Sequence, residues 1–115
     1  MITGATVLLI SRDLQARARV ERAVTEVGAT LTAATQAQLE TIGSTRFDVV
    51  LLDLDEAEGS VGPGERLAKE SGGRIGYYSH VSPELADKAA TEGWRTIPRG
   101  RFWRELPELL KEALS

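Results

Sequence analysis

The stretch that decides the fold is Phe47-Asp48-Val49-Val50-Leu51-Leu52-Asp53-Leu54-Asp55, a run of apolar residues that ends in carboxylates. The run is too short to span a membrane, and its Val and Leu residues are typical of a central strand covered on both faces of a sheet. In open α/β sheets, ligands and reaction sites lie at the carboxyl ends of the strands. Asp53 is therefore predicted to stand at a functional edge of the sheet, either as a working group or as what remains of one.

The composition of the chain bounds the class of protein. A length of 115 residues is that of one domain with a single core, so we expect residues 1–115 to fold as one unit. A net charge of −3 gives no general attraction to nucleic acid or to an anionic membrane. The chain has no cysteine and a single histidine, His80, which excludes Cys-based zinc sites and leaves little room for a His-based metal site or a catalytic triad. The apolar run at residues 5–10 is too short for a signal peptide, so we expect a cytoplasmic protein.

Strand-like and helix-like patterns alternate along the chain. Besides the opening run, short apolar runs predict strands at residues 5–11, 29–34, 74–79 and 95–98. Amphipathic or capped stretches predict helices at residues 14–27, 35–44, 64–71, 82–92 and 102–114. Right-handed crossovers then place a parallel five-stranded sheet between two helix layers, a (βα)5 doubly wound α/β fold. The first and third strands are the most apolar and should be central, which predicts the flavodoxin-like strand order 2-1-3-4-5.

Several helix ends carry local signals. Asp13 is a predicted N-cap and Gly28 a predicted C-terminal stop for the first helix. Thr35 and Gln38 have the spacing of a capping box. Pro107 is expected near the first turn of the last helix, because a proline in a helix interior costs about 3 kcal/mol or more.

The order and lengths of these elements resemble the receiver domain of bacterial response regulators over the whole chain. Val49-Val50-Leu51-Leu52-Asp53 looks like the third strand with its phospho-acceptor aspartate, and Ser79 matches the hydroxyl residue that ends the fourth strand. Residues 89–93 (AATEG) resemble the end of the fourth helix. The resemblance implies a non-enzymatic protein of two-component signal transduction or a phosphorelay.

Two departures from the receiver pattern concern its chemistry. Receivers carry paired acids after the first strand, which hold Mg²⁺, but here those positions are Ser11 and Arg12, and only the next residue, Asp13, is acidic. A guanidinium repels a metal ion, and phosphoryl transfer needs a divalent ion, so we expect no Mg²⁺ cofactor for the usual route. Receivers also place a lysine after the fifth strand, which Arg99 can replace only with a one-residue shift, and the switch aromatic of that strand is missing. These departures indicate a degenerate receiver, or pseudo-receiver.

A pocket around Asp53 is expected to contain Ser11, Arg12, Asp13, Ser79 and Arg99. Because Arg12 ends the first strand and Asp53 ends the adjacent third strand, we expect an ion pair between them, with the guanidinium in the place of the metal.

The most unusual local composition is a cluster of tryptophans and arginines. Its residues are Trp94, Arg95, Arg99, Arg101, Trp103 and Arg104. Trp and Arg are typical anchors of protein interfaces, so we expect a protein partner or a second copy to bind the face formed by residues 82–92, 95–98 and 102–114. One alternative is that a tryptophan packs over the edge of the core while the arginines are solvated. Another is a single-stranded nucleic acid patch, against which the overall acidity argues.

Three functions remain open from the sequence. The first is a regulatory or protein-interaction module that is not phosphorylated by the usual Mg²⁺-dependent route. The second is a phosphorylatable response regulator receiver that uses Asp53 as phospho-acceptor and needs Mg²⁺. The third is a small-ligand-binding or enzymatic domain on the same fold, since this fold hosts many functions.

Overall fold

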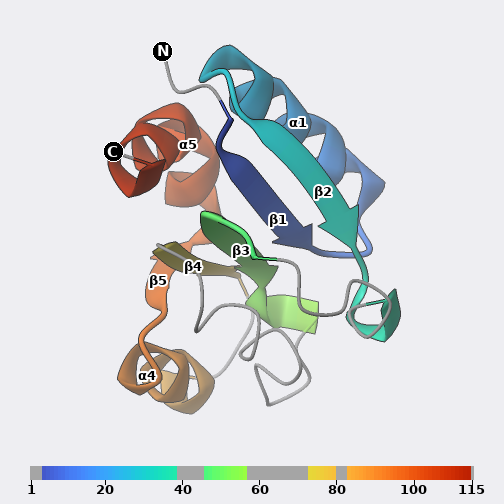
Figure 1. Ribbon diagram of the computed structural model, residues 1–115. Coiled ribbons are helices and arrows are strands. Elements are labelled where there is room, and N and C mark those ends of the chain that lie inside the picture. Colours follow the sequence, from blue (N-terminus) through green and yellow to red (C-terminus); the bar gives the residue numbers. More distant parts are fainter. Residues whose placement is uncertain (1–3, 39–45, 57–72, 80–82, 115) are drawn as a thin grey trace.

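The computed structural model describes residues 4–38, 46–56, 73–79 and 83–114 (Figure 1). Its five parallel strands are β1 (Thr6–Ile10), β2 (Thr30–Ala34), β3 (Val49–Asp53), β4 (Gly73–Tyr78) and β5 (Arg95–Pro98). The helices of the described part are α1 (Leu14–Glu26), α4 (Pro83–Thr91) and α5 (Arg99–Leu114), with short 3₁₀ turns at Gln36–Gln38 (η1) and Leu54–Glu56 (η2). The predicted helix at 64–71 and the end of the one at 35–44 lie outside the described residues.

The strands are arranged in the order β2-β1-β3-β4-β5, as the sequence predicts. The order confirms that β1 and β3 are central, and it confirms β2 as an edge strand. Within the sheet Ile10 pairs with Leu52, and Asp53 pairs with Tyr77. The carboxyl ends of the three central strands therefore meet at one edge, where the loops after β1 and β3 face each other.

Both faces of the central strands are buried. Leu9 and Leu51 belong to an apolar cluster that also contains residues of α1 and α5, while Leu8 and Leu52 belong to a second cluster with α4 and Trp94. Each strand thus sends alternate side chains to opposite faces, and β3 is buried throughout its length. This burial on both faces explains why the opening run is continuously apolar.

The local signals of α1 are confirmed. The Asp13 carboxylate accepts hydrogen bonds from the backbone N–H groups of Gln15 (2.9 Å) and Ala16 (3.3 Å), as an N-cap does. Gly28 follows the helix with a φ of 82°, a conformation that suits glycine. At η1, the Thr35 N–H donates to Gln38 Oε1 at 2.9 Å, which is one half of the predicted capping box.

The prediction for the last helix is wrong at its start. Helix α5 begins at Arg99, directly after β5, so Pro107 lies inside the helix and not near its first turn. The proline has no N–H to offer the Trp103 carbonyl one turn earlier. The helix continues because tertiary packing compensates, with Leu106, Leu109 and Leu110 all buried against the sheet. No helix in the described part of the chain is long and apolar enough to cross a membrane.

Candidate functional site

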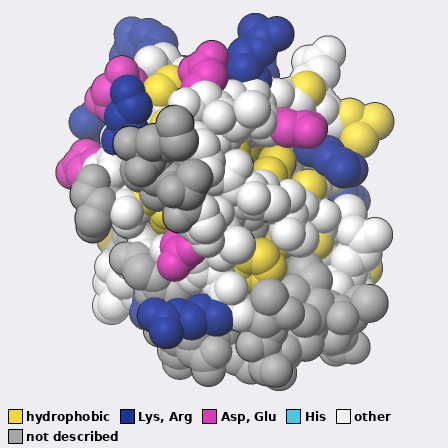
Figure 2. Space-filling view, turned by 45° about the horizontal axis from the view of Figure 1, so that its top comes forward, with side chains coloured by type: hydrophobic (Ala, Val, Ile, Leu, Met, Phe, Trp, Pro, Cys, Tyr) yellow, Lys and Arg dark blue, Asp and Glu magenta, His cyan; other side chains and the backbone are white. Residues whose placement is uncertain are grey.

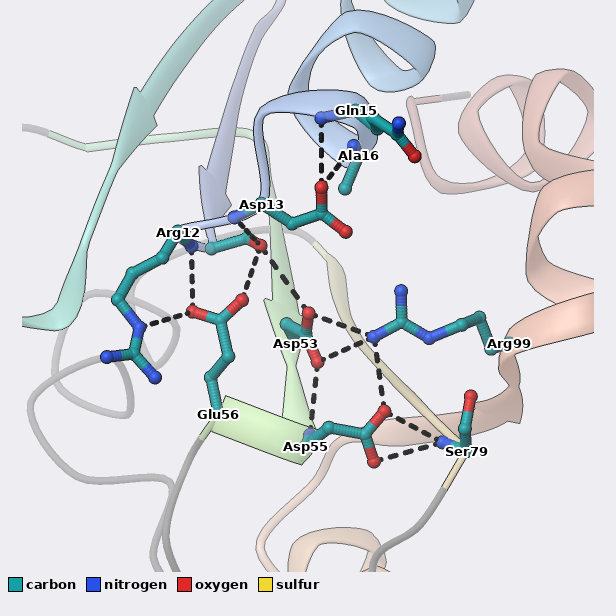
Figure 3. Close-up of polar contacts among 10 residues, drawn as sticks. Arg12, Asp13, Gln15, Ala16, Asp53, Asp55, Glu56, Ser79 and Arg99 are labelled. Carbon is teal, nitrogen blue, oxygen red and sulfur yellow. Dashed lines mark hydrogen bonds and ion pairs between the residues drawn. The ribbon is translucent and has the colours of Figure 1, made fainter.

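Asp53 is the last residue of β3 and lies at the edge of the sheet formed by the carboxyl ends of the strands (Figure 3). Only 1% of the residue is exposed. A carboxylate this deep in a protein is stable only if other groups replace its lost hydration. The surrounding side chains come from four elements and supply such contacts.

The main partner of Asp53 is Arg99, the first residue of α5. One guanidinium nitrogen, Nη2, lies 3.1 Å from Oδ1 and 3.0 Å from Oδ2 of Asp53, and 3.1 Å from Oδ2 of Asp55. The guanidinium carbon also lies 5.1 Å from the centre of the Tyr77 ring. Arg99 is thus held by two carboxylates and an aromatic face at once.

A second carboxylate, that of Glu56 in η2, accepts hydrogen bonds from the two residues that follow β1. The Ser11 hydroxyl donates to Glu56 Oε2 at 2.7 Å and makes a longer contact of 3.4 Å with Asp53 Oδ2. The Arg12 backbone N–H donates to Glu56 Oε1 at 2.7 Å. Glu56 therefore fills the space beside Asp53, a role that the sequence did not reveal.

The predicted ion pair between Arg12 and Asp53 is wrong. The Arg12 side chain is 69% exposed, and its Nε lies 3.5 Å from Glu56 Oε1. The reason is the alternation of side chains at the end of β1: Ser11 is buried beside Asp53, whereas Arg12 is turned to solvent. The cation that reaches Asp53 comes from the far end of the chain instead.

The remaining residues of the expected pocket contact Asp53 indirectly. The Asp55 N–H donates to Asp53 Oδ1 at 3.1 Å, and the Ser79 N–H donates to both carboxylate oxygens of Asp55 at 3.0 Å. Ser79 thus reaches the site through its backbone. As the cap of α1, the Asp13 carboxylate accepts hydrogen bonds from the backbone N–H groups of Gln15 and Ala16. The backbone N–H of Asp13 donates to the Ser11 hydroxyl at 3.1 Å.

The electrostatics of the site follow from its burial. Burial raises the pKa of Asp53 to about 6; the Arg99 charge lowers it, and the neighbouring Glu56 carboxylate raises it further. Burial alone would lower the pKa of Arg99, but Asp53 and Asp55 more than offset this, so the net change is upward. Arg99 therefore stays charged, while the ionised form of Asp53 is costly to maintain.

Comparison with known proteins adds the fold family. Neither protein-family models nor curated protein sequences match this chain. Among solved structures, it is similar to a response regulator from Thermotoga maritima, with a TM-score of 0.78, 18% identity, and coverage of 96% of this chain and 97% of that one. A response regulator from Hahella chejuensis (TM-score 0.71, 14% identity, coverage 97% and 96%) and a CheY-like protein, TadZ, from Pseudomonas aeruginosa (0.70, 16%, 96% and 99%) are also similar.

The chain has the receiver fold. The sequence resemblance is confirmed at the level of fold, and Asp53 is the last residue of β3.

The donor set of this receiver fold does not suit Mg²⁺. Both oxygens of Asp53 accept from Arg99, and both oxygens of Glu56 accept from the loop after β1. A guanidinium within 3.1 Å of the acid also repels a second cation. Within the described ranges, no three His, Cys, Asp or Glu side chains gather in a way that could hold a metal ion.

The tryptophans and arginines of the candidate interaction face do not form one surface. Trp94 is only 2% exposed and belongs to the core on the α4 face, so its expected role as a partner contact is wrong. Trp103 packs on the opposite face of the sheet, where the Arg19 guanidinium lies 5.3 Å from the centre of its ring. The two tryptophans lie on opposite faces of the sheet. Trp94, just before β5, packs on the α4 face, whereas Trp103 belongs to α5, which covers the other face.

Apart from Arg99, the arginines of that cluster are solvated. Arg95 pairs with Glu112 at 3.5 Å and Arg101 pairs with Glu105 at 2.7 Å, and Arg104 is exposed. In the view of Figure 2, cationic and anionic side chains lie interspersed over the upper part of the molecule, with apolar side chains between them.

Proposed function

We propose that this protein is a signal-transduction module with the receiver fold that acts by binding a protein partner, without Mg²⁺-dependent phosphorylation of Asp53. The observation that carries the proposal is the contact of Arg99 Nη2 with both oxygens of Asp53. In this proposal the module is cytoplasmic and non-enzymatic, and Arg99 supplies permanently the positive charge that a metal ion would bring.

Phosphoryl transfer to a carboxylate requires an oxygen that is free to attack and a divalent ion that offsets charge on the transferring group. The proposal that Asp53 lacks both is supported by the contacts of Arg99 with its two oxygens and by Ser11 and Arg12 after β1. The guanidinium stabilises the carboxylate, lowers its nucleophilicity and cannot act as a metal ligand. Asp53 then works as an anchor for α5.

The partner surface in this proposal includes the exposed arginines of β5 and α5, Arg95, Arg101 and Arg104. The carboxylate partners of Arg95 and Arg101 also lie at the surface, so these two pairs hold the side chains weakly and a partner's acids can replace them. The mixture of charges favours a protein partner or a second copy over nucleic acid, which requires a broad basic surface.

The experiment is to incubate the protein with acetyl phosphate and Mg²⁺ and to measure its intact mass. The expected result is an unchanged mass, equal to that of the Asp53→Asn variant treated in the same way. Calorimetric titration with Mg²⁺ should show no binding that depends on Asp53. Addition of one phosphoryl group to the parent, absent from Asp53→Asn, would overturn the proposal in favour of a phosphorylatable receiver.

A further inference from the structure

A continuous stack of rings and cations leads from Asp53 to the surface between α1 and α5. Arg99 lies over the Tyr77 ring, and Tyr77 stacks on Phe102 with ring centres 4.3 Å apart and planes inclined by 15°. Phe102 meets Trp103 edge to face at 4.9 Å. Arg19 of α1 covers the outer side of Trp103 at 5.3 Å. Stacked rings, edge-to-face rings and cations over ring faces all attract one another, so the members favour one shared arrangement.

The first turn of α5 has no cap of its own. Its preceding residue is Pro98, whose side chain has no hydrogen-bonding atom, and no acid lies in the first turn. The first residue is instead a cation, Arg99, which the positive end of the helix disfavours. The ion pairs of Arg99 with Asp53 and Asp55 therefore fix the turn that carries Phe102 and leads directly into Trp103.

Trp103 is also the wall between two hollows of the surface. A groove of about 380 Å³ is lined by Arg19, Arg22, Leu106 and Pro107 together with Trp103. A second hollow of about 360 Å³ is lined by Ser79, Arg99 and Gly100, and it shares both Arg19 and Trp103 with the first. A movement of Trp103 changes the shape of both hollows, one above the acid site and one between the helices.

We propose that the charge on Asp53 sets the position of Trp103 and Arg19 through Arg99 and the ring stack, so that the α1–α5 surface responds to the state of the acid site. This inference deepens the proposed function, because it treats Asp53 as the anchor of α5. With Asp53 neutral, Arg99 keeps its contact with the charged Asp55 carboxylate, but its two contacts with Asp53 are no longer reinforced by opposite charge. The first turn of α5 then loosens, and Trp103, one turn further on, becomes more exposed.

A proton is the simplest agent that neutralises Asp53, and the raised pKa of its carboxyl group places that event near pH 6. The charged or titratable groups around it are Asp55 and Glu56 of η2, Tyr77 of β4, Arg99 of α5, and Arg12 and Asp13 of the loop after β1. Burial and the Asp53 charge raise the pKa of Tyr77, so its hydroxyl stays neutral.

The experiment uses Trp103 as the reporter in the full chain. The chain has two tryptophans and one histidine, so a Trp94→Phe/His80→Gln background leaves Trp103 as the only tryptophan and removes the one imidazole, a group whose ordinary pKa is about 6.5. Emission and acrylamide quenching are followed from about pH 5 to about pH 8. We expect a red shift and stronger quenching as the pH falls, with a midpoint of about 6.

In the same background, Asp53→Asn should give the low-pH emission at every pH, with no titration. Arg101→Gln is the matched control, because Arg101 lies in the same turn as Arg99 and its ion pair is with the half-exposed Glu105 at the surface. It should titrate like the background. Far-UV circular dichroism confirms that each variant is folded.

Emission from Trp103 that stays constant with pH in the folded background would overturn the inference, and so would a titration that survives in Asp53→Asn. The pH titration needs no Asp53 variant, so the test holds even if that variant does not fold. Phosphorylation of Asp53 by acetyl phosphate would refute the proposed function alone, since the coupling to Trp103 is measured without a phosphodonor.

Discussion

Replacing Asp53 by its neutral isostere, in Asp53→Asn, should stabilise the fold at neutral pH. Burial raises the pKa of Asp53 from 3.8 to about 6, against the lowering by Arg99. The folded protein therefore binds this proton more tightly than the unfolded chain does. The contribution of Asp53 to stability is full below pH 3.8 and falls as the pH rises to about 6, above which the loss is complete.

The magnitude follows from the width of that interval. Each pH unit corresponds to about 1.4 kcal/mol, so the ionised Asp53 costs the fold about 3 kcal/mol at neutral pH. Asparagine removes the cost of burying a charge, but it also removes the negative charge that strengthens the hydrogen bonds from Arg99. Arg99 still contacts the charged Asp55 carboxylate. The free energy of unfolding should rise by about 1–3 kcal/mol at pH 7.5 and change little near pH 4.

Urea unfolding followed by circular dichroism at both pH values measures the difference. Asp87→Asn, an exposed position on α4, is the matched control and should change stability by no more than about 0.5 kcal/mol at either pH. An Asp53→Asn variant that is less stable than the parent at pH 7.5 would refute the reasoning, because the attraction of Arg99 would then exceed the cost of burial. An equal gain at both pH values would refute it too.

Three further substitutions test the local structure by thermal or urea unfolding. Asp13→Ala removes the cap of α1 and should destabilise the fold by about 1 kcal/mol, with Asp13→Ser restoring most of the loss. Pro107→Ala restores the donor for the Trp103 carbonyl and should stabilise the fold by about 1–3 kcal/mol; an unchanged midpoint would mean that the carbonyl has another partner. Gly76→Ala places a Cβ 3.0 Å from two Leu54 carbons and should cost about 1–3 kcal/mol, whereas a neutral outcome would show that Leu54 can move aside.

The sequence was sufficient for the fold because the fold depends on repeated local patterns. The continuous apolar run of β3 follows from burial on both faces, and the Asp13 cap and the Gly28 stop are set by their own neighbours. Strand order then follows from which runs are most apolar. None of these inferences requires knowing which distant side chains meet.

The side chains that contact Asp53 could not be predicted from local sequence patterns, because they lie far from it along the chain. Arg12 and Arg99 both lie at the carboxyl edge of the sheet, and side-chain direction at the end of β1 decides between them. Glu56 escaped notice because its partners are 44 and 45 positions away. The burial of Trp94 could have been inferred from the alternation of side chains along β5. This alternation places Trp94 on the face opposite to Ile97, and both faces of the sheet are covered by helices.

The pairing of Asp53 with Arg99, 46 positions later, has a consequence for the order in which the protein can mature. On the ribosome, the chain has made β1, β2 and β3 long before α5 emerges, so the acid has no guanidinium to meet. Until then it must stay hydrated or protonated, and the edge of the nascent sheet stays open to water. Arg99 reaches this edge only when α5 has been made, so the acid site is assembled after the strands that carry it.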